Sequence, residues 1–199
     1  MVHRGFQTAW DEIADGVLGT IEEALEEFPD FDIVFAGGSM GGAVATLGAA
    51  NARAAGHEVD LYTFGSPRVG NDILSDFITN QPGAEYRVTH NEDPVPRLPP
   101  TTLFPAYRHI SPEYWLTGEP ADPDHWPVED IKVCEGNASR ECIARPGNGN
   151  NILDHTFYLG SLECWAEDAA GTFGVSDIPP EIQEEILKNA EAETNAVPV

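Results

Sequence analysis

The chain has 199 residues, of which 41% are hydrophobic and 22% charged, a composition that predicts one folded domain with an apolar core. With 34 acidic and 10 basic side chains its formal net charge is −24, which disfavours binding to nucleic acids or to anionic lipid headgroups. Its apolar stretches fall short of the roughly 18 residues of a membrane span, and the N-terminus Met1–Phe6 lacks the apolar segment of a signal peptide.

The first 90 residues alternate between helical and extended patterns. Apolar residues three and four apart indicate an amphipathic helix, and short apolar runs indicate strands, the first of them fully buried as in parallel sheets. Helices are expected at 6–28, 43–52 and 69–80, and strands at 32–36, 59–64 and 86–90. This order predicts an α/β protein with a mostly parallel sheet and with helices on both of its faces.

Frequent prolines interrupt the chain beyond residue 91. A strand is expected at 107–110, whereas 116–152 is predicted to be mostly loop. A helix containing Tyr158, Leu162 and Trp165 is predicted after Asp154, and an acidic helix runs from about 180 to 193. We therefore expect one main domain over 1–175, followed by an acidic C-terminal helix and tail over 176–199.

A candidate nucleophile stands between the first predicted strand and the helix that follows it. Residues 37–41 read Gly-Gly-Ser-Met-Gly and match the pattern G-x-S-x-G, which in this context is typical of a nucleophile elbow around Ser39. Such a turn is strained, and it needs neighbours without large side chains so that strand and helix can approach closely. The glycines and alanines of 37–45 meet that requirement. An ordinary or phosphate-binding turn is the alternative, but no P-loop lysine follows.

A serine in such a turn requires a base, and in α/β-hydrolases the chain order is serine, acid, histidine. His155 follows the Gly/Asn-rich loop 147–151 and precedes an apolar segment, so it is expected on a loop above a rigid scaffold. His109 lies in a strand pattern, and His125 lies among prolines and aspartates in a loop that we expect to be solvated. His155 is therefore the predicted general base.

The acid is expected where a strand ends, because open α/β sheets collect their functional groups at the carboxyl ends of the strands. Asp93 follows the strand predicted at 86–90, and Pro94 and Pro96 stiffen the segment after it. Its role would be to hold the imidazole of His155 in the correct tautomer. Glu92 and Asp72 are the competing carboxylates.

Four segments closely resemble the class 3, or fungal-type, lipases, a group that includes feruloyl esterases. The resemblance runs from residue 2 to about 166 and implies an α/β-hydrolase fold with Ser39 as nucleophile, Asp93 as acid and His155 as base. It also implies that the backbone N–H of Met40 is one oxyanion donor. The segments that carry it are 36–47, 62–71, 90–100 and 154–155.

The chain also departs from the family pattern. Family members usually have His where Gly38 stands and Leu where Met40 stands. Only 38 residues precede Ser39, and about 23 of them form the first predicted helix, which leaves no room for the strand and loop that supply a second oxyanion donor. The resemblance therefore implies a chain that lacks the family's N-terminal edge strands and lid, and whose activity is impaired.

The resemblance also concerns the three cysteines. It implies a short-range disulfide between Cys134 and Cys142, and a partner for Cys164 in the segment that precedes this chain; a buried free thiol is the alternative for Cys164. Asn137 begins an N-glycosylation sequon, Asn-Ala-Ser, between Cys134 and Cys142. Both features suit the extracellular location of the parent family.

The predicted function is that of a serine carboxylic-ester hydrolase of the lipase type, which forms an acyl-enzyme on Ser39. No metal or organic cofactor is expected, and the expected ligand is an ester substrate such as an acylglycerol. Two alternatives stay open at this point: a feruloyl or other carbohydrate-ester esterase, and a catalytically inactive fragment.

Overall fold

A computed structural model describes residues 1–101, 107–118, 126–160 and 179–195. Its centre is a five-stranded sheet in the order β1-β2-β4-β6-β7. The first four strands are parallel and β7 is antiparallel to β6. The strands are β1 (Ile33–Gly38), β2 (Val59–Phe64), β4 (Glu85–His90), β6 (Glu113–Leu116) and β7 (Ile131–Cys134). A separate two-stranded sheet pairs β3 (Gly70–Asn71) with β5 (Tyr107–Arg108).

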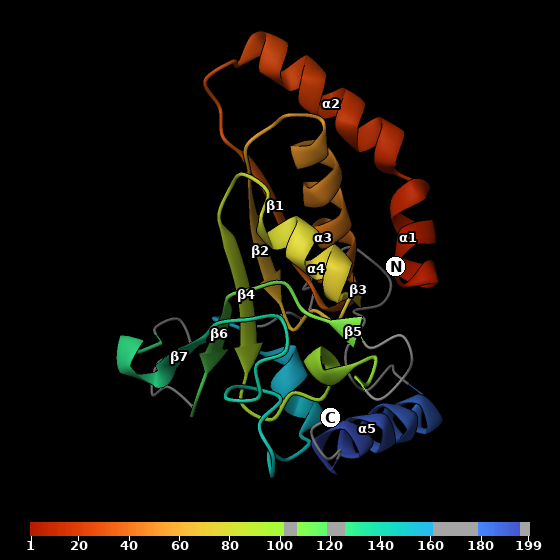
Figure 1. Ribbon diagram of the computed structural model, residues 1–199, viewed down its shortest axis with the longest axis vertical. Helices are drawn as coiled ribbons and strands as arrows, with labels where there is room; N and C mark the ends of the chain where they lie inside the picture. Colours follow the sequence, from red (N-terminus) through yellow and green to blue (C-terminus); the bar gives the residue numbers. More distant parts are fainter. Residues whose placement is uncertain (102–106, 119–125, 161–178, 196–199) are drawn as a thin grey trace, which may run out of the picture.

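The helices α1, α3 and α4 lie on the same side of the sheet (Figure 1). Alanines of α3 pack with Val59 and Leu61 of β2 and with Ile78 of α4 to form the main core. The described helices are α1 (Arg4–Asp11), α2 (Ala14–Glu27), α3 (Ser39–Ala54), α4 (Asp72–Thr79) and α5 (Pro180–Asn195), and the short 3-10 helices are η1 (Val95–Arg97), η2 (Val128–Asp130) and η3 (Ile152–Thr156).

The opposite face of the sheet carries a row of partly exposed tyrosines from three adjacent strands. The rings of Tyr62 and Tyr86 are stacked with centroids 4.5 Å apart, and Tyr114 lies 5.7 Å from Tyr86. The expectation of helices on both faces is therefore wrong for the described part of the chain. The crossovers β1-α3-β2 and β2-α4-β4 both run over the same face.

The strand β1 is less buried than its apolar sequence predicts. Val34 is 55% exposed, because β1 stands at the edge of the described sheet and α3 covers only one of its faces. The expectation of a fully buried strand at 32–36 is thus wrong: the residues of β1 that face the core are half-buried and the alternate ones are exposed.

The helix predicted at 6–28 is divided in two by a turn at Glu12 and Ile13. Trp10 is 2% exposed and packs its ring edge-on against Phe35, which anchors α1 to the core. No residue of α2 is fully buried. Residues 6–28 share one apolar periodicity, but only α1 packs against the core through a buried residue. This packing, and not the periodicity, therefore decides where α1 ends.

The region beyond residue 91 holds more regular structure than its prolines suggest. The predicted loop 116–152 contains β7, and β6 ends at Leu116. The strand predicted at 107–110 is reduced to β5, which pairs with β3 and not with the main sheet. Tyr158 follows η3 without entering a helix, and Leu162 and Trp165 lie outside the described residues.

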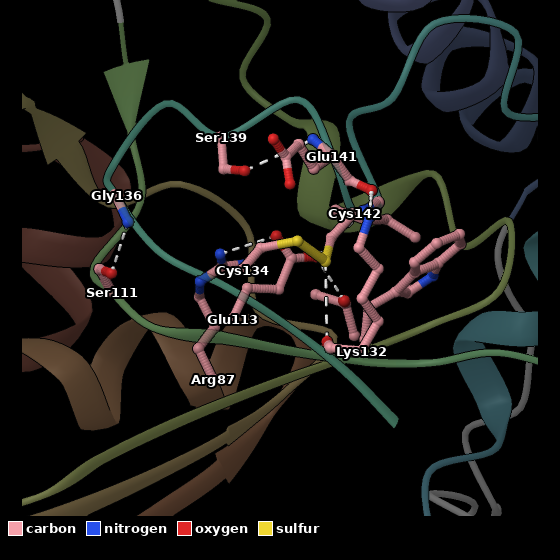
Figure 2. Close-up of a disulfide and its surroundings, with 12 residues drawn as sticks. Arg87, Ser111, Glu113, Lys132, Cys134, Gly136, Ser139, Glu141 and Cys142 are labelled. Atoms are coloured by element: carbon pink, nitrogen blue, oxygen red, sulfur yellow. Dashed lines mark hydrogen bonds and ion pairs between the residues drawn. A yellow bond between two sulfur atoms is a disulfide. The ribbon is translucent and has the colours of Figure 1, made fainter. Parts of the chain in front are cut away.

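The disulfide between Cys134 and Cys142 closes the loop that follows β7 (Figure 2). Both cysteines are buried, and they pack with Trp115 and Ile143. The carboxylate of Glu113 lies beside them and accepts hydrogen bonds from Thr89 Oγ1 at 2.5 Å, Arg87 at 2.9 Å and the backbone N–H of Ile143 at 3.1 Å. A buried, fully bonded carboxylate thus ties the disulfide loop to β4. Cys164 lies outside the described residues.

The C-terminal helix α5 contacts η1, and its Ala190 is fully buried. Within the described ranges, no helix is both long and apolar enough to span a lipid bilayer.

Candidate active site

Ser39 occupies the sharp turn between β1 and α3. Its φ angle is +51°, in the left-handed region that a residue with a side chain rarely adopts. A Cβ at Gly37 would lie 2.4 Å from the carbonyl oxygen of Gly41, and one at Gly42 would lie 2.8 Å from Cβ of Ser66. The absence of side chains at Gly37 and Gly42 therefore lets strand and helix approach. Gly41 itself is exposed and a Cβ there would meet nothing within 4 Å, so the close approach does not require a glycine at this position, contrary to the expectation.

Asp93 lies in the turn after β4 and is completely buried. Its Oδ1 accepts a hydrogen bond from the backbone N–H of Val95 at 2.8 Å. Its Oδ2 accepts hydrogen bonds from Nδ1 of His155 at 2.8 Å and from the hydroxyl of Tyr158. Three donors thus compensate the burial of one carboxylate.

His155 lies in η3, where its ring is held between Asp93 and the serine. Because the carboxylate of Asp93 can only accept, Nδ1 of His155 carries the hydrogen and Nε2 is free to accept. Nε2 lies 2.8 Å from Oγ of Ser39. The three predicted residues, 116 positions apart at the extremes, therefore form one hydrogen-bonded chain in which Ser39 donates to His155 and His155 donates to Asp93. This arrangement can transfer a proton away from the serine hydroxyl.

Arg97 connects the segments that carry the acid and the base. Its buried guanidinium donates to the carbonyl oxygen of Glu92 at 3.3 Å, and also to the carbonyl oxygen of Gly149 and the side chain of Asn150. Glu92 immediately precedes Asp93, and Gly149 and Asn150 precede η3. Arg97 thus ties together the two segments that carry the acid and the base.

The competing candidates lie elsewhere. The carboxylate of Glu92 faces Gly149, and Asp72 accepts from the backbone N–H of Ile73 in the first turn of α4. His109 is buried, with Nε2 2.6 Å from the carbonyl oxygen of Pro96; burial, together with Arg87 and Arg68, holds its pKa well below the ordinary value. His109 is therefore a packed, neutral residue. His125 lies outside the described residues.

The helix α3 begins at Ser39 itself, so its N-terminus lies at the candidate nucleophile. Met40 belongs to the first turn of α3, whose backbone N–H groups have no acceptor within the helix. The residue is 61% exposed, and the predicted oxyanion role concerns its backbone N–H, not its side chain. The partial positive charge of the helix terminus favours negative charge near this turn.

Tyr158 is a further residue of the site, and the sequence did not predict its contact with Asp93. Its hydroxyl donates to the same oxygen of Asp93 that accepts from His155, and the residue is 4% exposed. Burial and the charge of Asp93 raise the pKa of Tyr158 well above its ordinary value, so the phenol keeps its proton and acts as a donor. The spacing of three residues from His155 is the only signal in the sequence that could have suggested this contact.

Two further predicted features concern groups outside the triad. The side-chain nitrogen of Asn137, which would carry a glycan, donates to Asp76 at 2.6 Å; glycosylation stays a prediction. In the described part of the chain, no group of three or more His, Cys, Asp or Glu side chains could hold a metal ion.

The mostly parallel sheet, the strained serine turn and the Ser39–His155–Asp93 chain define an α/β-hydrolase fold. Residues 1–103 match the model of the family Lipase (class 3), and the chain belongs to this family. It is 51% identical over 161 residues to secreted mono- and diacylglycerol lipase 1 of Fusarium solani. The match covers 81% of this chain and 47% of that protein.

Solved structures agree with this assignment. A mono- and diacylglycerol lipase from Aspergillus oryzae superimposes with a TM-score of 0.73 at 36% identity, over 80% of this chain and 59% of that one. A triacylglycerol lipase whose catalytic centre is a serine protease triad matches with a TM-score of 0.69 at 28% identity, over 80% and 59% of the two chains. The chain spans about half the length of the curated relatives it matches.

Proposed function

We propose that this chain hydrolyses carboxylic esters of glycerol through an acyl-enzyme formed on Ser39. The observation that carries the proposal is the hydrogen-bonded chain in which His155 lies 2.8 Å from both Ser39 and Asp93. The preference for acylglycerols is supported by relatives that are named mono- and diacylglycerol lipases. The buried Cys134–Cys142 disulfide supports an oxidising, extracellular setting.

In the first half of the reaction, His155 Nε2 accepts the proton of Ser39 while Oγ attacks the ester carbonyl carbon. The buried carboxylate of Asp93 stabilises the imidazolium that forms. The oxyanion of the tetrahedral intermediate accepts from the N–H of Met40 at the start of α3. His155 then gives its proton to the departing glycerol oxygen, and the acyl group remains on Ser39.

In the second half, His155 accepts a proton from a water molecule that attacks the acyl carbon. The second tetrahedral intermediate uses the same N–H donor. Collapse of this intermediate returns the proton from His155 to Oγ of Ser39 and releases the fatty acid. Every proton moves through Nε2 of His155, and its distance of 2.8 Å from Oγ of Ser39 supports this role.

The test compares the wild-type protein with Ser39→Ala on a monoacylglycerol, a diacylglycerol and a feruloyl ester. Removal of a triad serine lowers turnover by a factor of about 10⁶ in a comparable hydrolase, so we expect loss of acylglycerol hydrolysis. Ser75→Ala removes a buried serine of α4 outside the triad and should retain the rate. A folded wild-type protein that cleaves none of these esters would refute the proposal, and faster cleavage of the feruloyl ester would refute the substrate assignment.

A further inference from the structure

Two separate segments carry the acid and the base of the triad, and the side chain of Asp154 joins them. Its Oδ2 accepts a hydrogen bond from the backbone N–H of Glu92 at 2.9 Å. Its Oδ1 accepts from the side-chain nitrogen of Asn151 at 2.8 Å, and the backbone N–H of Asn151 donates to the carbonyl oxygen of Glu92 at 3.0 Å. One buried carboxylate thus bridges the turn after β4 and the beginning of η3.

The position of this bridge in the chain makes it relevant to the triad. Glu92 precedes Asp93, and Asp154 precedes His155, so the bridge lies one residue away from each partner of the 2.8 Å bond between Asp93 and His155. Both carboxylate oxygens of Asp154 are directed at Glu92 and Asn151 and not at Ser39. The side chain can therefore act on the reaction only through the placement of the acid and the base.

Resting on the proposed function, we propose that Asp154 is a positioning residue: its ionised carboxylate holds the acid turn and the base segment in register and thereby maintains the hydrogen bond from His155 to Asp93. Ionisation matters because both partners of the carboxylate are donors. A protonated carboxyl is a weaker acceptor and adds a hydrogen of its own between the two donors, so the bridge is weakened.

Charged and titratable groups face Asp154 from each neighbouring segment. From β4, Nδ1 of His90 donates to the carbonyl oxygen of Asp154 at 3.1 Å. Glu92 and Asp93 face it from the acid turn, and His155 is its neighbour within η3. Arg145, Glu92 and Asp154 itself line one cavity of about 320 Å³.

Burial raises the pKa of Asp154, and the charges of Asp93 and Glu92 add to the rise; the N–H of Glu92 and His90 oppose it. Because the pKa is higher in the folded than in the unfolded chain, the ionised form makes folding less favourable above that pKa. A neutral amide at this position removes the charge, but it also places an NH2 donor against one of the two N–H donors.

The kinetic experiment compares Asp154→Asn with Asp60→Asn. Asp60 also accepts from a backbone N–H, that of Ala84 at 2.8 Å, but near the opposite end of the sheet. We expect Asp154→Asn to lower kcat about tenfold with KM within about twofold, since a misplacement of the order of 1 Å costs about 10²-fold. In the pH profile of the wild-type protein, kcat should also fall at the acidic pH values where Asp154 gains its proton. The profile of Asp154→Asn should lack this part of the acidic decrease. Asp60→Asn should retain the wild-type profile.

A second measurement does not depend on ester turnover. The Nδ1–H proton of His155, assigned by its absence from His155→Asn, should give a strongly downfield proton resonance in wild type and Asp60→Asn. It should weaken and move upfield in Asp154→Asn. If the wild-type protein shows this resonance but hydrolyses no ester, the proposed function is refuted. The change of chemical shift between wild type and Asp154→Asn then still decides whether Asp154 positions the triad. An unchanged resonance and kcat in Asp154→Asn, or no such resonance in the wild type, would overturn the inference.

Discussion

Gly65 lies directly behind the hydrogen bond between the acid and the base. It follows β2 with a φ angle of +61°, and its N–H donates to the carbonyl oxygen of Val88 at 3.0 Å. A Cβ at this position would lie 3.0 Å from Oδ2 of Asp93 and 3.0 Å from both Cε1 and Nδ1 of His155. The change Gly65→Ala therefore places one methyl group against both partners of a single bond.

Two effects combine in Gly65→Ala. The left-handed backbone of an alanine costs about 1–2 kcal/mol. Contacts of 3.0 Å are about 0.5 Å shorter than favourable van der Waals distances, so the ring of His155 or the carboxylate of Asp93 moves by about that amount. The 2.8 Å bond would then lengthen to about 3.3 Å, outside the usual range for a hydrogen bond between nitrogen and oxygen. We expect kcat to fall about tenfold.

The control is Gly136→Ala. Gly136 has a φ angle of +92° and a Cβ there would meet nothing within 4 Å, so the backbone cost is present without the contact. Chemical denaturation should show destabilisation of both variants, with the greater loss in Gly65→Ala. Ester hydrolysis should fall in Gly65→Ala alone. Equal kcat values for the two variants at matched folded fractions would show that the space behind the triad does not constrain it.

Two other predictions follow from buried groups. Tyr158→Phe removes a hydrogen-bond donor to the carboxylate of Asp93. The free energy of unfolding, measured by urea denaturation, should fall by about 1.5–3 kcal/mol, and kcat should fall about tenfold. A variant that matches the wild type in both quantities would exclude this role. Because the pKa of His109 is lowered in the folded chain, only the unfolded chain binds a proton as pH falls below about 6.5. Stability should therefore fall by up to about 1.4 kcal/mol per pH unit relative to His109→Gln, and parallel stability curves for the two proteins from pH 7 to 5 would contradict this.

The turn around Ser39 could be predicted because its causes are local. Gly37 and Gly42 lie within three residues of the serine, and their lack of side chains is visible in the chain itself. The positions of Asp93 and His155 were predicted from strand ends, chain order and family resemblance. Their mutual distances depend on contacts such as those of Arg97 and Asp154, which join residues more than 50 positions apart.

The strands β6 and β7 were not predicted because their stability depends on their neighbours. Glu113 argues against a buried strand when read alone, yet Arg87 and Thr89 of β4 satisfy its carboxylate. Local spacing thus specified α3, β2 and the serine turn, since propensity and close approach act over a few residues. The exposure of Val34 at the sheet edge, the donor role of Tyr158 and the bridge at Asp154 were decided by the fold, because burial and hydrogen bonding depend on which distant segments meet.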